Sequence, residues 1–121
     1  MKNMIYFSLI VFSSLTLSQC GDDPMTNECT GVVATYDGIV GDFLTASCAF
    51  VGCHDQTTRS GGVDFSNYAP AKAYLDRSNN KFLCGINHSS GCSPMPQGAA
   101  KLDDTTIKIF TCWYNNGYLK N

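Results

Sequence analysis

The sequence has few charged residues and no long hydrophobic run. Only 15% of its 121 residues are charged, and the formal net charge is −2. A slightly acidic chain lacks the basic face that nucleic-acid binding requires, so we expect no nucleic-acid partner. The chain is too short for two hydrophobic cores, while a mean hydropathy of −0.08 and 12% aromatic residues exclude a disordered tail. We therefore expect one folded domain.

The sequence also lacks the patterns of a β-sheet, of internal repeats and of the common catalytic sites. No segment alternates cleanly between polar and apolar residues, which argues against strands. Asp103 and Asp104 are adjacent but fit a helix cap better than an acid/base pair. No serine or cysteine has a recognisable base at a suitable spacing. These absences favour an all-α fold and a protein that is not an enzyme.

The N-terminal segment has the features of an export signal. A positively charged start precedes an apolar run from Met4 to Leu17, and a helix of this length reaches only about 21 Å, short of the ~30 Å of a bilayer core. We predict a lipoprotein signal peptide over residues 1–19. The sequence Leu-Ser-Gln-Cys ending at Cys20 is similar to a bacterial lipobox, in which the cysteine is lipidated. Ordinary cleavage after Ser18 is the alternative.

Residues 20–28 form a short acidic tether after the predicted signal. Gly21 to Pro24 includes two adjacent aspartates. A stretch of this kind resembles a surface-export signal of some Gram-negative bacteria, and a plain linker is the alternative. The folded domain is then expected at residues 29–121, outside the cytoplasm and lipid-anchored to a bacterial membrane on its periplasmic or cell-surface side. Such a location permits disulfides.

Two apolar stripes predict the main helices. One stripe comprises Tyr36, Ile39, Val40, Phe43 and Leu44, and the other comprises Ile107, Phe110, Trp113 and Tyr114. Asp103 or Asp104 is expected to cap the second helix, and a shorter helix is expected over residues 68–77 with Asn67 as its cap. Residues 57–62 and 84–98 are expected to be irregular. The predicted fold is small and all-α with long loops, and we expect it to need disulfides or a large buried cofactor for its stability.

The string Cys48-x4-Cys53-His54 is the most informative feature of the chain. Covalent haem attachment needs two nearby thiols that add to the vinyl groups. An imidazole directly after the second cysteine is then brought under the iron as its proximal ligand. The common motif has two residues between the cysteines, and four is a rarer variant. The same spacing also suits a small disulfide loop.

Met95 is the candidate for the distal iron ligand. A methionine thioether is the usual sixth ligand in small electron-transfer cytochromes, where it lies on a loop over the distal haem face. Met95 lies between Pro94 and Pro96, outside any periodic helix. Methionine more often fills gaps in a core, but a residue between two prolines in an irregular segment is poorly placed for that use.

In this order, the motifs resemble those of the small class I cytochrome c domains of bacterial secreted proteins and lipoproteins. The resemblance covers residues 29 to 118 and rests on Tyr36-x6-Phe43-Leu44, Cys48-Ala49-x3-Cys53-His54, Gly61-Gly62-Val63-Asp64-Phe65-Ser66-x-Tyr68, Ile86-Asn87-His88, Ser93-Pro94-Met95-Pro96-x-Gly98, Lys101-Leu102 and Trp113-Tyr114-Asn115-Asn116-Gly117.

The resemblance implies a cytochrome c-like fold with one covalent haem c. Cys48 and Cys53 would anchor the haem, and His54 and Met95 would ligate its iron. Trp113 would pack on the haem edge where the last helix crosses the first. The implied function is that of a monohaem c-type cytochrome, tethered to a membrane, that carries single electrons between extracytoplasmic redox proteins.

His88 lies between Cys84 and Cys92, and three roles stay open for it. It can replace Met95 as the distal iron ligand, which would lower the redox potential. It can belong to a zinc site, in which zinc would take four ligands from Cys84, His88, Cys92, Cys53 and His54. It can also simply form a hydrogen bond within its loop.

Four further cysteines are disulfide candidates, and sequence alone does not choose among their pairings. We favour Cys84 with Cys92, and Cys29 with Cys112, a bridge that would tie the two main helices together. If Cys48 also paired with Cys53, the protein would be a haem-free, disulfide-stapled lipoprotein that acts as a binding module. This is the alternative function.

Overall fold

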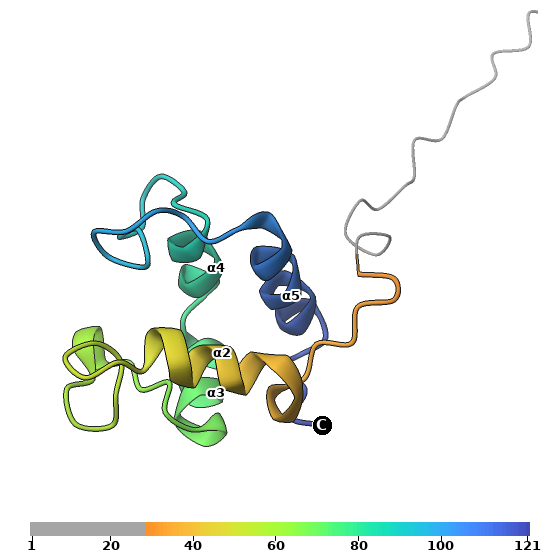
Figure 1. Cartoon of the computed structure of the whole chain (residues 1–121), viewed down its shortest axis with the longest axis horizontal. Coiled ribbons are helices and arrows are strands. Elements are labelled where there is room, and N and C mark those ends of the chain that lie inside the picture. Colours follow the sequence, from red (N-terminus) through yellow and green to blue (C-terminus); the bar gives the residue numbers. More distant parts are fainter. Residues whose placement is uncertain (1–28) are drawn as a thin grey trace, which may run out of the picture.

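The computed structural model describes residues 29–121, and this part of the chain contains helices and no strand (Figure 1). The helical elements are η1 Tyr36–Val40, α2 Gly41–Phe43, η2 Leu44–Cys48, η3 Ser60–Gly62, α3 Tyr68–Arg77, α4 Lys81–Ile86 and α5 Asp104–Asn115. The expected all-α class is therefore confirmed for these residues. The predicted signal peptide 1–19, the tether 20–28 and the lipidated Cys20 lie outside them.

The first main helix consists of η1, α2 and η2, which follow directly on one another. η1 and η2 have the wide turns of a π-helix. Of the predicted apolar stripe, Val40 and Leu44 are buried, whereas Ile39 is 52% exposed. The prediction that Ile39 faces the core is therefore wrong, because turns with i→i+5 hydrogen bonds do not keep the 3.6-residue period on which the stripe was based.

Gly41 is fixed in this helix by a close approach of the preceding turn. A Cβ atom at this position would lie 2.5 Å from the carbonyl oxygen of Tyr36 and 2.9 Å from its ring. No other residue type fits without moving the helix backbone. The glycine that lowers helix propensity here is therefore required by packing.

α3 spans the expected residues 68–77 and α5 begins beside its expected cap residues, but only one of the two helices is capped as expected. Asp103 caps α5, since its carboxylate accepts hydrogen bonds from the Thr106 backbone N–H (3.0 Å) and hydroxyl (2.7 Å). Asn67 stands at the N-cap position of α3, yet its amide donates to the Ser66 hydroxyl at 3.2 Å and forms no cap. The predicted capping role of Asn67 is therefore wrong.

α4 is a helix that the sequence did not predict. It includes Cys84 to Ile86, the first residues of the segment expected to be irregular. At six residues it is too short to show a periodic stripe, although Phe82 and Leu83 are buried. Asn79 and Asn80, with φ of 47° and 66°, separate it from α3. Residues 87–98 form no helix, as expected.

A chain of edge-to-face aromatic contacts runs through the core. Phe82 packs on Phe65 with ring centroids 5.7 Å apart and on Phe110 at 5.1 Å, and Phe110 packs on Phe43 at 5.4 Å. These contacts join the first helix, α4, α5 and the segment before α3. Because Phe82 and Phe110 each contact rings from two other elements, this cluster holds the helices at fixed positions around the loops.

Two loops lie on the same side of the view in Figure 1, to the left. One follows η2 and the other connects α4 to α5. The N-terminal end of the described chain lies at the right. No helix among residues 29–121 has both the length and the apolar character needed to cross a membrane.

Candidate functional site

The Cys48–His54 segment begins where the first helix ends. The helix closes at Cys48, and Ala49 donates to the Leu44 carbonyl at 2.8 Å. A tight turn then returns the chain, so that the backbone N–H of Cys53 donates to Phe50 at 2.8 Å and that of His54 to Cys48 at 3.2 Å. The turn therefore brings the backbone of His54 back to the end of the helix.

Cys48 and Cys53 are both unpaired, in different surroundings. Cys48 is half-buried and Cys53 is exposed. Burial, with a smaller contribution from the neighbouring Cys53, raises the pKa of the Cys48 thiol to about 11. Since the thiolate is the reactive form of cysteine, Cys48 is protected from adventitious reaction at neutral pH. The structure thus keeps two unpaired thiols on the segment that ends in His54.

The His54 ring is held by packing rather than by hydrogen bonds. Its centroid lies 5.3 Å from that of Phe65 in an edge contact, and the Phe65 backbone N–H donates to the His54 carbonyl at 2.8 Å. The buried Nδ1 atom of His54 has no hydrogen-bond partner. A buried polar atom without a partner costs stability and calls for an explanation, such as a group from outside the polypeptide.

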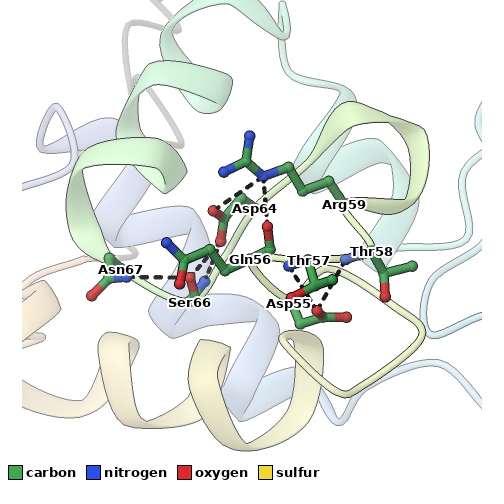
Figure 2. Close-up of polar contacts among 8 residues, drawn as sticks. All are labelled: Asp55, Gln56, Thr57, Thr58, Arg59, Asp64, Ser66 and Asn67. Atoms are coloured by element: carbon green, nitrogen blue, oxygen red, sulfur yellow. Dashed lines mark hydrogen bonds and ion pairs between the residues drawn. The ribbon is translucent and has the colours of Figure 1, made fainter.

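Asp55 organises the loop directly after His54 (Figure 2). Its carboxylate accepts hydrogen bonds from the backbone N–H groups of Gly52 (3.0 Å), Thr57 (2.9 Å) and Thr58 (3.0 Å). The Thr58 hydroxyl first, and then these N–H groups, hold the pKa of the Asp55 carboxyl well below its usual range. Asp55 therefore joins the turn inside the Cys48–His54 segment to the loop that follows it.

A second carboxylate, Asp64, secures the far end of this loop (Figure 2). Asp64 is buried, accepts a hydrogen bond from the Ser66 backbone N–H at 2.9 Å, and lies 3.7 Å from Arg59 Nε. Sequence reasoning missed Asp55 and gave Asp64 no role of its own. The signal for Asp55 was local: an aspartate can bind the backbone N–H groups two and three residues further on.

Met95 lies in the irregular segment and packs on α4. It is half-buried against the core, and its backbone N–H donates to the Gly85 carbonyl at 3.0 Å. The Nε2 atom of His88 lies 3.2 Å from the Met95 carbonyl oxygen. His88 thus forms a hydrogen bond within its loop, which is one of the three roles left open by the sequence.

The structure contains the two disulfides favoured from the sequence. Cys29 is bonded to Cys112 (S–S 2.09 Å) and Cys84 to Cys92 (2.08 Å). Cys29 precedes the first helix, so its bridge ties the N-terminal segment to α5, and the expectation that it ties the two main helices is wrong. The zinc site is also wrong, because Cys84 and Cys92 are consumed in a disulfide. Among residues 29–121, no group of three His, Cys, Asp or Glu side chains is placed to hold a metal ion.

Trp113 is fully buried at the C-terminal end of α5. Its ring lies 5.1 Å from that of Tyr118 and 6.4 Å from that of Tyr36, and its Nε1–H donates to the Leu119 carbonyl at 2.8 Å. It therefore lies where α5 meets the start of the first helix, as expected. Its contact with a haem edge stays a prediction.

An open groove of about 720 Å³ lies elsewhere, between the ends of α3 and α5. Asparagine and tyrosine side chains form much of its wall, and of the predicted functional and disulfide residues it includes only Cys29. The groove is lined by Cys29, Leu75, Asp76, Asn79, Asn80, Tyr114, Asn115, Asn116 and Tyr118.

The donor groups near the two loops are therefore two thiols, one imidazole with a partnerless nitrogen, and one thioether. Comparison with known proteins adds nothing to this description, since the chain matches no protein family, no curated protein and no solved structure.

Proposed function

We propose that this protein is a monohaem c-type cytochrome with a small class I cytochrome c-like fold. In this proposal it is anchored to a bacterial membrane through lipid on Cys20 and carries single electrons between extracytoplasmic redox proteins. The two disulfides are typical of proteins that fold outside the cytoplasm, which favours an exported carrier.

The observation that carries the proposal is the selective pairing of the cysteines. Four of the described cysteines form disulfides, while Cys48 and Cys53 stay unpaired on the segment that ends in His54. That histidine has a buried nitrogen with no partner in the protein. Two free thiols followed directly by an imidazole are the groups that covalent haem attachment uses.

The residues fit a haem group in their chemistry. Cys48 and Cys53 would hold the porphyrin through thioether bonds, and His54 and Met95 would ligate its iron. When bound, the haem would supply one-electron chemistry. Phe65 orients the His54 ring by its edge contact, and Asp55 fixes the loop behind it, so both would limit movement of the proximal ligand.

Two protein ligands on the iron would favour electron transfer over chemistry on a bound substrate. With His54 and Met95 both engaged, no position would be left for oxygen or peroxide, whereas loss of Met95 would open one. The half-buried Met95 and the loop that carries it are therefore expected to decide between the two kinds of reactivity.

Intact mass and a haem stain after denaturation test the proposal. The full chain, expressed with the haem-attachment machinery, should carry one haem that stays on the denatured polypeptide. Cys48→Ser/Cys53→Ser should lose it, while the matched variant Cys84→Ser/Cys92→Ser should keep it. In addition, Met95→Ala should remove the methionine–iron charge-transfer band. The intact mass also reports lipid on Cys20.

A colourless, folded protein with three disulfides would refute the proposal. That result would instead support the haem-free lipoprotein that acts as a binding module, with Cys48 bonded to Cys53. A coloured protein whose spectrum lacks the methionine band would keep the haem assignment and remove Met95 as the distal ligand.

A further inference from the structure

We propose that His88 is a positioning residue for Met95: its imidazole holds the Met95 carbonyl and fixes the methionine loop on α4. The part that concerns iron ligation rests on the proposed function, whereas the contact itself does not. His88 Nε2 lies 3.2 Å from the Met95 carbonyl oxygen. A carbonyl oxygen only accepts hydrogen bonds, so Nε2 must carry the proton and donate.

The backbone of His88 is set to make this contact. His88 has a φ of 54°, in the left-handed region that few residues with bulky side chains adopt. Its backbone N–H donates to the Gly85 carbonyl at 3.0 Å. The Met95 N–H donates to the same carbonyl at 3.0 Å. The Gly85 carbonyl therefore links His88 and Met95 through backbone hydrogen bonds, and the His88 side chain adds a direct hydrogen bond between the two residues.

Gly85 allows the methionine loop to lie directly on α4. A Cβ atom at this position would be 3.2 Å from the Ser93 carbonyl oxygen and 3.6 Å from Met95 Cγ. The Cys84–Cys92 disulfide closes the segment between helix and loop. The bridge holds one end of the methionine loop, and Gly85 holds the Met95 N–H. The His88 hydrogen bond then fixes the Met95 carbonyl.

A loop that is ordered before ligation favours its own methionine over competing ligands. The conformational entropy of holding the thioether in place is then lost on folding and not on ligation. The Nε2 atom of His88 is committed to this loop, so the geometry assigns His88 to support Met95 rather than to replace it. Removing the donor should loosen Met95 and make it easier to displace.

The test compares His88→Asn with His88→Gln in the full-length protein. Asparagine tolerates the left-handed backbone but has a shorter side chain, whereas glutamine brings an amide donor nearly as far as Nε2. Ser89→Ala, at an exposed neighbouring position, is the control. The measurements are the methionine–iron band, the affinity for added imidazole, which competes with Met95 for the iron, and the hydrogen exchange of the Met95 amide.

For His88→Asn we expect imidazole to bind about fivefold tighter and the Met95 amide to exchange about fivefold faster, the effect of one lost hydrogen bond. His88→Gln should return the imidazole affinity and the Met95 amide exchange rate most of the way to the values of the unmodified protein, and Ser89→Ala should match that protein. Equal values for His88→Asn and the unmodified protein would overturn the inference. So would a failure of glutamine to restore them, or a spectrum of two histidine ligands that His88→Asn abolishes.

The two proposals fail in different ways. A protein without haem refutes the proposed function, yet the Met95 amide exchange still shows whether His88 holds the loop. A protein with haem and a methionine band, in which His88→Asn changes neither the imidazole affinity nor the exchange of the Met95 amide, refutes the positioning role alone.

Discussion

Replacing both cysteines of one disulfide at a time should reveal very different contributions from the two bridges. The Cys29–Cys112 pair has a sequence separation of 83, and the Cys84–Cys92 pair has a separation of 8. The chain-entropy relation then gives a stabilisation of about 4.5 kcal/mol for the long loop and about 2.5 kcal/mol for the short one. Cys29→Ala/Cys112→Ala should therefore destabilise the protein by about 2 kcal/mol more than Cys84→Ala/Cys92→Ala.

The burial of Cys112 should enlarge the difference in stability between the two variants that loop length predicts. The Cys112 side chain is fully buried in the core, so its replacement also removes packing contacts. Cys84 and Cys92 are only half-buried. The difference between the two variants should therefore be at least the one that loop entropy gives.

Urea unfolding followed by circular dichroism is the assay. With a slope of roughly 1.5 kcal/mol per molar urea, the two transition midpoints should differ by more than about 1 M. Ser89→Ala/Ser90→Ala, which keeps both bridges and changes two exposed positions, should unfold like the unmodified protein. Equal midpoints, or a larger loss from the short bridge, would refute the reasoning from loop length.

Two further perturbations address the loops. Gly85→Ala should speed exchange of the Met95 amide, because its Cβ would lie 3.2 Å from the Ser93 carbonyl oxygen and the methionine loop must shift to relieve this contact. Hydrogen bonds in the folded state lower the pKa values of Asp55 and Asp103 below 3.8, so their stabilisation is present above that pH and is lost as the pH falls through the lower folded values. Urea midpoints measured below pH 4 should therefore fall less steeply in Asp55→Asn and Asp103→Asn than in the unmodified protein, and equal slopes would contradict this.

The helices that could be predicted from the sequence are the ones with enough length to show a period. α5 carries Ile107 and Phe110 at helical spacing behind a capping Asp103, and the structure forms this helix directly after that cap. α4 has only six residues, and its buried Phe82 contacts Phe65 and Phe110, which lie far away in the sequence. A helix stabilised by tertiary contacts leaves no local pattern to find.

The candidate site divides in the same way. Spacing alone pointed to Cys48, Cys53 and His54 as candidates, since these residues lie close together in the sequence and form a recognisable motif. The contact of His88 with Met95 depends on a left-handed backbone and on the shared Gly85 carbonyl, which spacing does not report. The partnerless Nδ1 of His54 likewise follows from burial by the whole fold.

The Cys29–Cys112 bond turns nearly the whole described chain into a covalent ring. A protease that cuts once in an exposed loop, such as the one over residues 55–62, leaves two fragments that stay bonded to each other. The fragments would part on reduction but not on denaturation alone. Outside the cell, where proteases act and disulfides persist, such a ring keeps a nicked protein in one piece, with Cys48 and Met95 still on the same covalent assembly.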